Sequence, residues 1–135
     1  MEFDDIWTKI DPQQFKQPDS KEMNLAALIE GEWRAAVIYE GMSKRCKSSN
    51  AAKEFAALSK SKRKILKELR AEYFILTGIK AERPRCEPHV PTVENLREMY
   101  LYEKSVAEIY GQRDEIREQA ENAIILLKRL ITAGI

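Results

Sequence analysis

The chain has 135 residues, 44% of them hydrophobic and 33% charged, which gives it the length of one domain and the composition of a globular protein. Its 23 basic and 22 acidic residues exclude a globally basic nucleic-acid binder. No apolar run approaches the roughly 18 residues of a membrane span, the acidic N-terminus lacks a signal-peptide pattern, and Cys46 and Cys86 are too few for a disulfide framework. We therefore expect a reduced, cytoplasmic protein that does not enter the membrane.

Residues 1–19 contain Pro12 and Pro18 and show no sustained helical period. We interpret this segment as an N-terminal arm with a short turn of helix near its start, and residues 20–135 as the folded domain. The apolar side chains of the arm are expected to dock on the domain or on a second copy of the chain. They are Phe3, Ile6, Trp7 and Ile10.

The rest of the chain shows four helical segments separated by capping and helix-ending residues. Asp19 precedes Glu22 by three residues, which is an N-terminal capping pattern, and Gly78 is a typical C-terminal stop. Candidate N-caps of the second and third helices are Ser48, Ser49, Asn50 and Thr92. We expect helices over residues 20–46, 51–77, 93–110 and 113–132.

A proline-containing connection, residues 78–91, joins the second and third helices. Its roughly fourteen residues reach about 45 Å when extended, whereas a helix of about 27 residues is roughly 40 Å long. The connection is therefore long enough to cross the bundle and make these two helices parallel. The sequence predicts an all-α four-helix bundle with a long crossover between helices two and three.

The two halves of the chain share a spacing pattern, as a duplicated helical hairpin would. The first half carries Leu25, Glu32 and Tyr39 at intervals of seven, and Leu96, Glu103 and Tyr110 repeat them with an offset of 71. Each glutamate lies in the middle of an apolar helical stripe, where an ionised carboxylate is costly to bury without a partner. Either the two carboxylates share a buried partner, or each lies at the edge of its stripe and reaches solvent.

Two segments resemble the rubrerythrins of the ferritin-like superfamily. IEGEWRAAVIY, residues 29–39, resembles their first-helix motif, and TVENLREMYLYEKSVAEIY, residues 92–110, resembles their third helix. The resemblance spans roughly residues 20–132 and implies a ferritin-like bundle. Family members hold a di-iron centre with one Glu from each of these helices and a Glu-x-x-His motif from each of the other two. On this alignment Glu32 and Glu103 match the first- and third-helix ligands.

The other ligand positions of that family do not carry its ligands. Helix two is aligned from Phe55 and helix four from Ile116, which are related by an offset of 61. On this alignment the positions that should hold Glu and His hold Lys62, Ile65, Ala123 and Leu126. The only histidine of the chain is His89, in the connection, and Glu121 is one further carboxylate that a rotated fourth helix would supply. We therefore expect no conventional di-iron centre.

Lys62 falls on the apolar stripe of helix two and is a candidate partner for both glutamates. Two Glu and one Lys leave one excess negative charge, so one Glu would be protonated with a raised pKa. Tyr39 and Tyr110 would donate hydrogen bonds to the carboxylates. The alternative is that Lys62 extends along the stripe until its ammonium reaches solvent.

These observations favour a structural or interaction protein that lacks catalytic activity, binds no cofactor and forms a homodimer. One alternative is a metal-binding or oxidoreductase protein that uses Glu32, Glu103 and Glu121 to hold iron or another divalent metal. Oxygen ligands alone would favour Mg²⁺ or Ca²⁺ over iron. A third possibility is an anion- or nucleic-acid-binding module on the basic second helix, which we do not expect because no aromatic residues interleave with SKSKRKILKELR. Cys86 and His89 lack a third ligand other than Glu87, so we assign them no site.

Overall fold

The computed structural model describes residues 20–87 and 89–133, and within them it shows four α-helices and no strand. The predicted all-α class is confirmed. The predicted arm, residues 1–19, lies outside the described residues. The helices are α2 (Ser20–Arg45), α3 (Ser49–Thr77), α4 (Val93–Ile109) and α5 (Asp114–Ala133).

Local chemistry explains where α3 and α4 begin and end. The Ser48 hydroxyl accepts the backbone N–H of Ala51 at 3.3 Å, and the Thr92 hydroxyl accepts that of Asn95 at 3.1 Å. Gly78 ends α3 with a φ of 72°, a left-handed conformation that favours glycine, and donates its N–H to the carbonyl of Phe74. Ser48, Thr92 and Gly78 are thus confirmed as caps.

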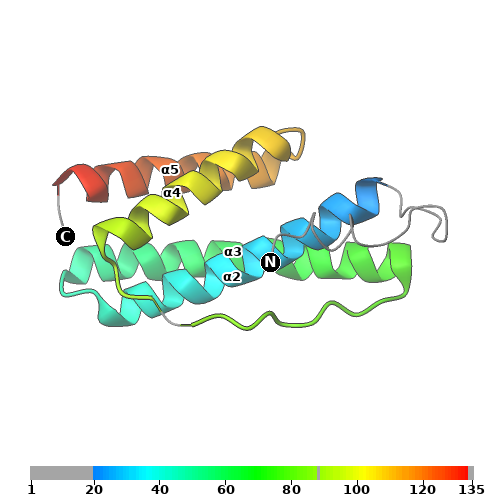
Figure 1. Ribbon diagram of the computed structural model, residues 1–135, viewed down its shortest axis with the longest axis horizontal. Helices are drawn as coiled ribbons and strands as arrows, with labels where there is room; N and C mark the ends of the chain where they lie inside the picture. The colour runs from blue at the N-terminus through cyan, green and yellow to red at the C-terminus, as the bar shows by residue number, and fades with distance from the viewer. Residues whose placement is uncertain (1–19, 88, 134–135) are drawn as a thin grey trace.

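The helices form two antiparallel hairpins, α2–α3 and α4–α5, that pack against each other, with α3 and α4 running in the same direction (Figure 1). The hairpins differ in length, because α3 has 29 residues and α4 only 17. At 1.5 Å per residue these helices are about 43 Å and about 25 Å long. One end of the α2–α3 hairpin therefore projects beyond the α4–α5 turn (Figure 1).

The connection between α3 and α4 follows α2 along its length (Figure 1). Near the middle of α2, the Arg34 guanidinium donates a hydrogen bond to the carbonyl of Arg85 at 2.8 Å. Further along, a Cβ atom at Gly41 would lie 3.2 Å from the backbone nitrogen of His89, so the missing side chain allows the connection to approach closely. Gly41 therefore allows the connection to lie close against α2.

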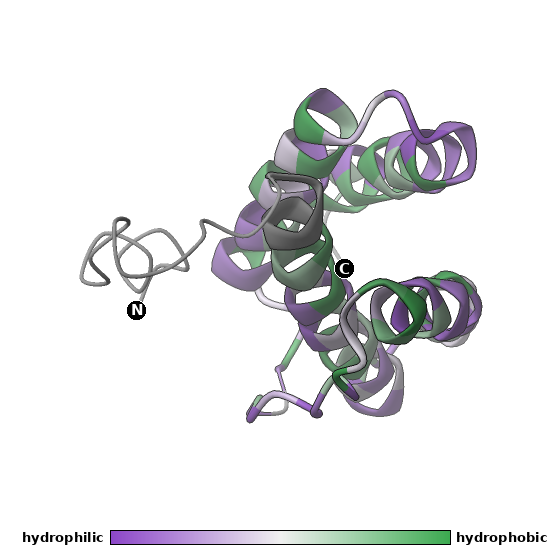
Figure 2. Cartoon of the chain, turned by 90° about the vertical axis from the view of Figure 1, so that its right-hand side faces the viewer, coloured by the Kyte–Doolittle hydropathy of each residue, from purple (hydrophilic) through white to green (hydrophobic). Residues whose placement is uncertain are grey.

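The apolar core is divided into two clusters by a layer of buried polar side chains. Apolar segments of the helices face the interior, and hydrophilic segments lie largely outside (Figure 2). One cluster includes Tyr39, Met42, Phe55, Leu58, Leu96 and Leu127. The other includes Leu25, Leu28, Ile65, Leu69, Val106 and Ile116. The residues predicted on the stripes of the first three helices are buried, except that Tyr110 is only half-buried; the buried ones include Leu25, Glu32, Tyr39, Phe55, Lys62, Leu96 and Glu103.

Candidate functional site

Three charged side chains lie in the layer between the two apolar clusters. They are Glu32 of α2, Lys62 of α3 and Glu103 of α4, and each has an exposed fraction of 0%. On its own helix, each lies on the same face as the buried apolar side chains. Because charges are buried only when they are paired or neutralised, their mutual geometry decides whether the fold can tolerate them.

The ammonium of Lys62 bridges the two carboxylates. Its Nζ lies 2.9 Å from Oε2 and 3.1 Å from Oε1 of Glu32, and 2.7 Å from Oε1 of Glu103. The three N–H groups of the ammonium thus have three acceptor oxygens. The structure brings Lys62 to both glutamates, and the alternative in which its ammonium reaches solvent is wrong.

Two tyrosines complete the hydrogen bonding of the carboxylates. The Tyr39 hydroxyl donates to Oε2 of Glu103 at 2.6 Å, and the Tyr102 hydroxyl donates to Oε2 of Glu32 at 2.5 Å. The Lys62 ammonium also lies 5.5 Å from the centroid of the Tyr102 ring, within the range of a cation–π interaction. Every carboxylate oxygen therefore accepts at least one hydrogen bond, and we call these five residues the Lys62 cluster.

The second tyrosine of this cluster differs from the predicted one. The repeat placed Tyr110 as the hydroxyl donor, but α4 ends at Ile109 and Tyr110 is its C-cap. Its ring packs half-buried at the edge of the second apolar cluster. The hydroxyl bound to Glu32 belongs to Tyr102, about two turns earlier on α4.

The sequence contains one indication of the Tyr102 contact, which is Gly31, the residue directly before Glu32. A Cβ atom at Gly31 would lie 2.7 Å from the Tyr102 hydroxyl oxygen and 2.9 Å from its ring carbon Cε1. Glycine inside a helix is unfavourable by about 1 kcal/mol relative to alanine, so its presence calls for a reason such as close packing. Here the missing side chain lets the Tyr102 ring cross α2 and reach the carboxylate.

Replacing Gly31 with alanine is expected to destabilise the protein by about 1–2 kcal/mol, because overpacking at Tyr102 outweighs the gain in helix propensity. In a Tyr102→Ala background the same substitution should instead stabilise, since the ring that it meets is gone. Urea unfolding of the four proteins of this double-mutant cycle measures the coupling. Equal effects of Gly31→Ala in both backgrounds would contradict the contact.

The electrostatics of the Lys62 cluster raise the pKa of one of its two carboxyl groups. Burial raises the pKa of Glu103, and the Glu32 charge adds to this effect, while the Lys62 ammonium opposes it. Burial also raises the pKa of Tyr39 and of Tyr102 well above the usual value, and the neighbouring carboxylates add to it. Both phenols therefore stay protonated and remain donors across the physiological pH range.

The fourth helix does not bring a further carboxylate to the site. Glu121 lies on the exposed side of α5, where its Oε1 is 3.3 Å from Nε of Arg117. The two α5 positions aligned with family ligands are apolar, with Ala123 fully buried and Leu126 partly buried against the first cluster. The fourth helix is therefore not rotated in the way that would have turned Glu121 inward.

The residues present do not fit a di-iron centre. The Lys62 ammonium lies between Glu32 and Glu103, at hydrogen-bond distance from both. Within residues 20–87 and 89–133, no group of three or more His, Cys, Asp or Glu side chains is placed to hold a metal ion. We therefore derive no chemistry through iron at this position.

Cys86 and His89 do not form an activated pair. The Cys86 thiol points to the carbonyl of Arg34 at 3.9 Å, and Nδ1 of His89 lies 2.7 Å from the carbonyl oxygen of Glu87. Burial raises the pKa of the Cys86 thiol, which keeps it protonated and weakens it as a nucleophile. These residues belong to the packing of the connection against α2.

Comparisons of the chain with protein-family models, with curated proteins and with solved structures gave no match. Among the helices that the structure describes, none combines the length and the apolar character needed to cross a membrane.

Proposed function

We propose that this chain is a ferritin-like bundle, related to the rubrerythrins, in which an ammonium group takes the place of the metal ions. Its role is structural or interactive and not catalytic. The observation that carries the proposal is the position of Lys62 Nζ, within 3.1 Å of oxygens of both Glu32 and Glu103. The parallel direction of α3 and α4 supports the ferritin-like topology (Figure 1).

An ammonium can perform the electrostatic part of the role of a metal ion. It supplies one positive charge between the two carboxylates and donates hydrogen bonds to both of them. Unlike a metal with open coordination positions, the ammonium has no site for a substrate. All four carboxylate oxygens already accept hydrogen bonds from Lys62, Tyr39 and Tyr102. The cluster therefore supports the bundle without offering a reactive centre.

The Lys62 cluster has a geometric role that apolar packing alone performs poorly. It joins α4 to the α2–α3 hairpin, because Glu103 contacts Lys62 of α3 and Tyr39 of α2. Sliding α4 by one turn would leave the Glu103 carboxyl among apolar side chains without its partners, which is costly. Buried polar groups of this kind can specify register at some cost in stability. We propose that the cluster sets the position of the second hairpin on the first.

The competing proposal is a metal-binding protein that uses the two carboxylates. Anaerobic titration of the purified protein with Fe(II), followed by elemental analysis, separates the two proposals. We expect no stoichiometric iron, and the same result for Glu32→Ala. The molar mass of the protein in solution, measured by light scattering on the same sample, tests the homodimer predicted from the sequence. Stoichiometric iron that is lost in Glu32→Ala would contradict our proposal and return the protein to the metal-dependent class.

A further inference from the structure

The end of α3 exposes a continuous apolar segment. The exposed fractions are 54% for Phe74, 81% for Ile75, 46% for Leu76 and 56% for Ile79. Phe74, Ile75 and Leu76 belong to the last turn of α3, and Ile79 begins the connection. This end of the α2–α3 hairpin projects beyond the α4–α5 turn (Figure 1). Single exposed apolar residues need no explanation, but a cluster of this kind usually marks an interaction surface.

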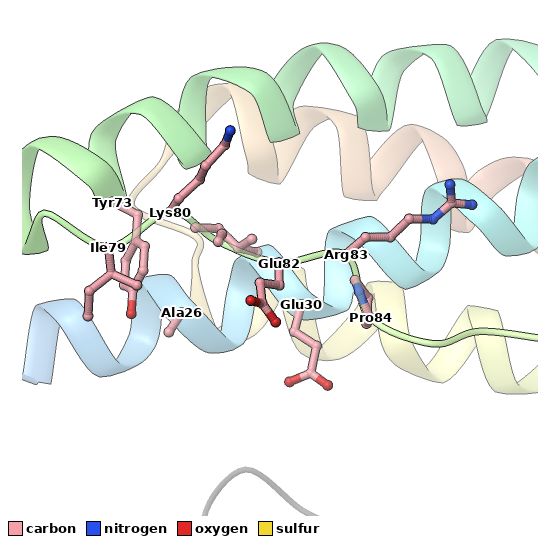
Figure 3. A pocket seen from close by; sticks show the side chains of 10 residues that line it. Ala26, Glu30, Tyr73, Ile79, Lys80, Glu82, Arg83 and Pro84 are labelled. Carbon is pink, nitrogen blue, oxygen red and sulfur yellow. The ribbon is translucent and has the colours of Figure 1, made fainter.

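A groove of about 420 Å³ adjoins this segment. It lies between the first half of α2, the end of α3 and the start of the connection, and Figure 3 shows Tyr73 and Ile79 side by side over α2 near Ala26. Ile29, Ala81 and Pro84 add further apolar lining. Charged side chains of both signs also line the groove, namely Glu30, Lys80, Glu82 and Arg83. Ile79 belongs both to the groove and to the exposed segment, and we call the groove together with Ile79 the α3-end surface.

The segment of residues 1–19 is suited to this surface by position and length. It joins α2 at Ser20, and Ala26 in the groove lies only about 9 Å further along the helix. The residues from Trp7 to Ser20 can span about 43 Å when extended. The segment can therefore reach every part of the α3-end surface of its own chain.

The apolar residues of this segment have the spacing of a helix face. Phe3, Ile6, Trp7 and Ile10 follow the i, i+3, i+4, i+7 pattern with which an amphipathic helix packs in an apolar groove. A covalently attached segment also has a local concentration in the millimolar range, which favours its own chain over a second copy in dilute solution.

We propose that the segment of residues 1–19 packs its apolar row of Phe3, Ile6, Trp7 and Ile10 on the α3-end surface of the same chain. In this arrangement the segment covers Ile79 and the groove beside it and withholds an apolar surface from other molecules. The proposal is independent of the Lys62 cluster, which lies in the core between the hairpins.

The experiment uses Trp7 as a reporter. The chain has two tryptophans, so Trp33→Phe in the full chain leaves Trp7 as the only one. We expect the fluorescence of Trp7 to have a short emission maximum and to be protected from quenching by acrylamide. Adding Ile79→Asp should shift the emission to the red and raise the quenching constant severalfold. Ile125→Asp is the matched control, because Ile125 is 68% exposed on α5 and is expected to leave the emission unchanged.

A second variant tests the same contact in case Ile79→Asp does not fold. Dilution shows whether the segment packs on its own chain or on a second copy. Ala26→Asp places a charge in the groove on the α2 side and should also release Trp7 while the circular dichroism of the helices is retained. Solvent-like Trp7 emission that Ile79→Asp leaves unchanged would overturn the proposal. A short-wavelength emission that is lost on dilution, together with a doubled mass at high concentration, would assign the surface to a second copy and overturn packing within one chain.

Discussion

Replacing Lys62 with methionine is expected to lower the free energy of unfolding by about 3–5 kcal/mol, the cost of leaving a buried charge without its partner. Methionine has a similar length and fills much of the space of the lysine side chain, so the loss reports the missing ammonium and not a cavity. Glu32 and Glu103 would then face each other without a cation, both at 0% exposure. Urea unfolding at neutral pH, followed by circular dichroism, measures the change.

Two variants make this result specific. Lys60→Met removes an exposed lysine from the same helix and should change the free energy of unfolding by less than about 0.5 kcal/mol. The triple variant Glu32→Gln, Lys62→Met, Glu103→Gln removes all three charges and should recover part of the loss, because no unpaired charge then remains in the core. A Lys62→Met protein as stable as the wild type would contradict a bridging role for the ammonium.

The stability contributed by Glu103 is expected to fall as the pH rises. Burial raises the pKa of Glu103 in the folded state, so the folded protein binds this proton more tightly than the unfolded chain does. The contribution is fully present below the ordinary pKa of glutamate and is lost as the pH rises through the raised pKa. Each unit by which the pKa is raised corresponds to about 1.4 kcal/mol.

Glu103→Gln isolates this effect from the titration of other carboxylates. Glutamine resembles the protonated carboxyl, so the variant should lack the decline, and its stability relative to the wild type should increase from acid to neutral pH. Glu98→Gln, an exposed residue on the same helix, is the control and should follow the wild-type profile. Parallel profiles for the wild type and Glu103→Gln would show that the pKa of Glu103 is not raised.

Much of the site could be predicted because its residues lie on regular helices. Glu32, Lys62 and Glu103 each continue an apolar stripe, and helical periodicity alone turns such residues toward the interior. Tyr102 could not be placed in the same way. The direction of its side chain depends on the rotation of α4 about its axis and on the close approach that Gly31 permits. Neither can be deduced from the spacing of residues along one helix.

The amino-acid sequence by itself determined the helices, their caps and the faces that they bury. Ser48, Gly78 and Thr92 act through bonds to residues three or four positions away, so their effect is readable without knowledge of the fold. Only the tertiary structure decided which buried charges meet, that Tyr102 and not Tyr110 contacts Glu32, and that Glu121 stays at the surface. These outcomes depend on distances between helices far apart in the chain, which packing sets and local periodicity does not.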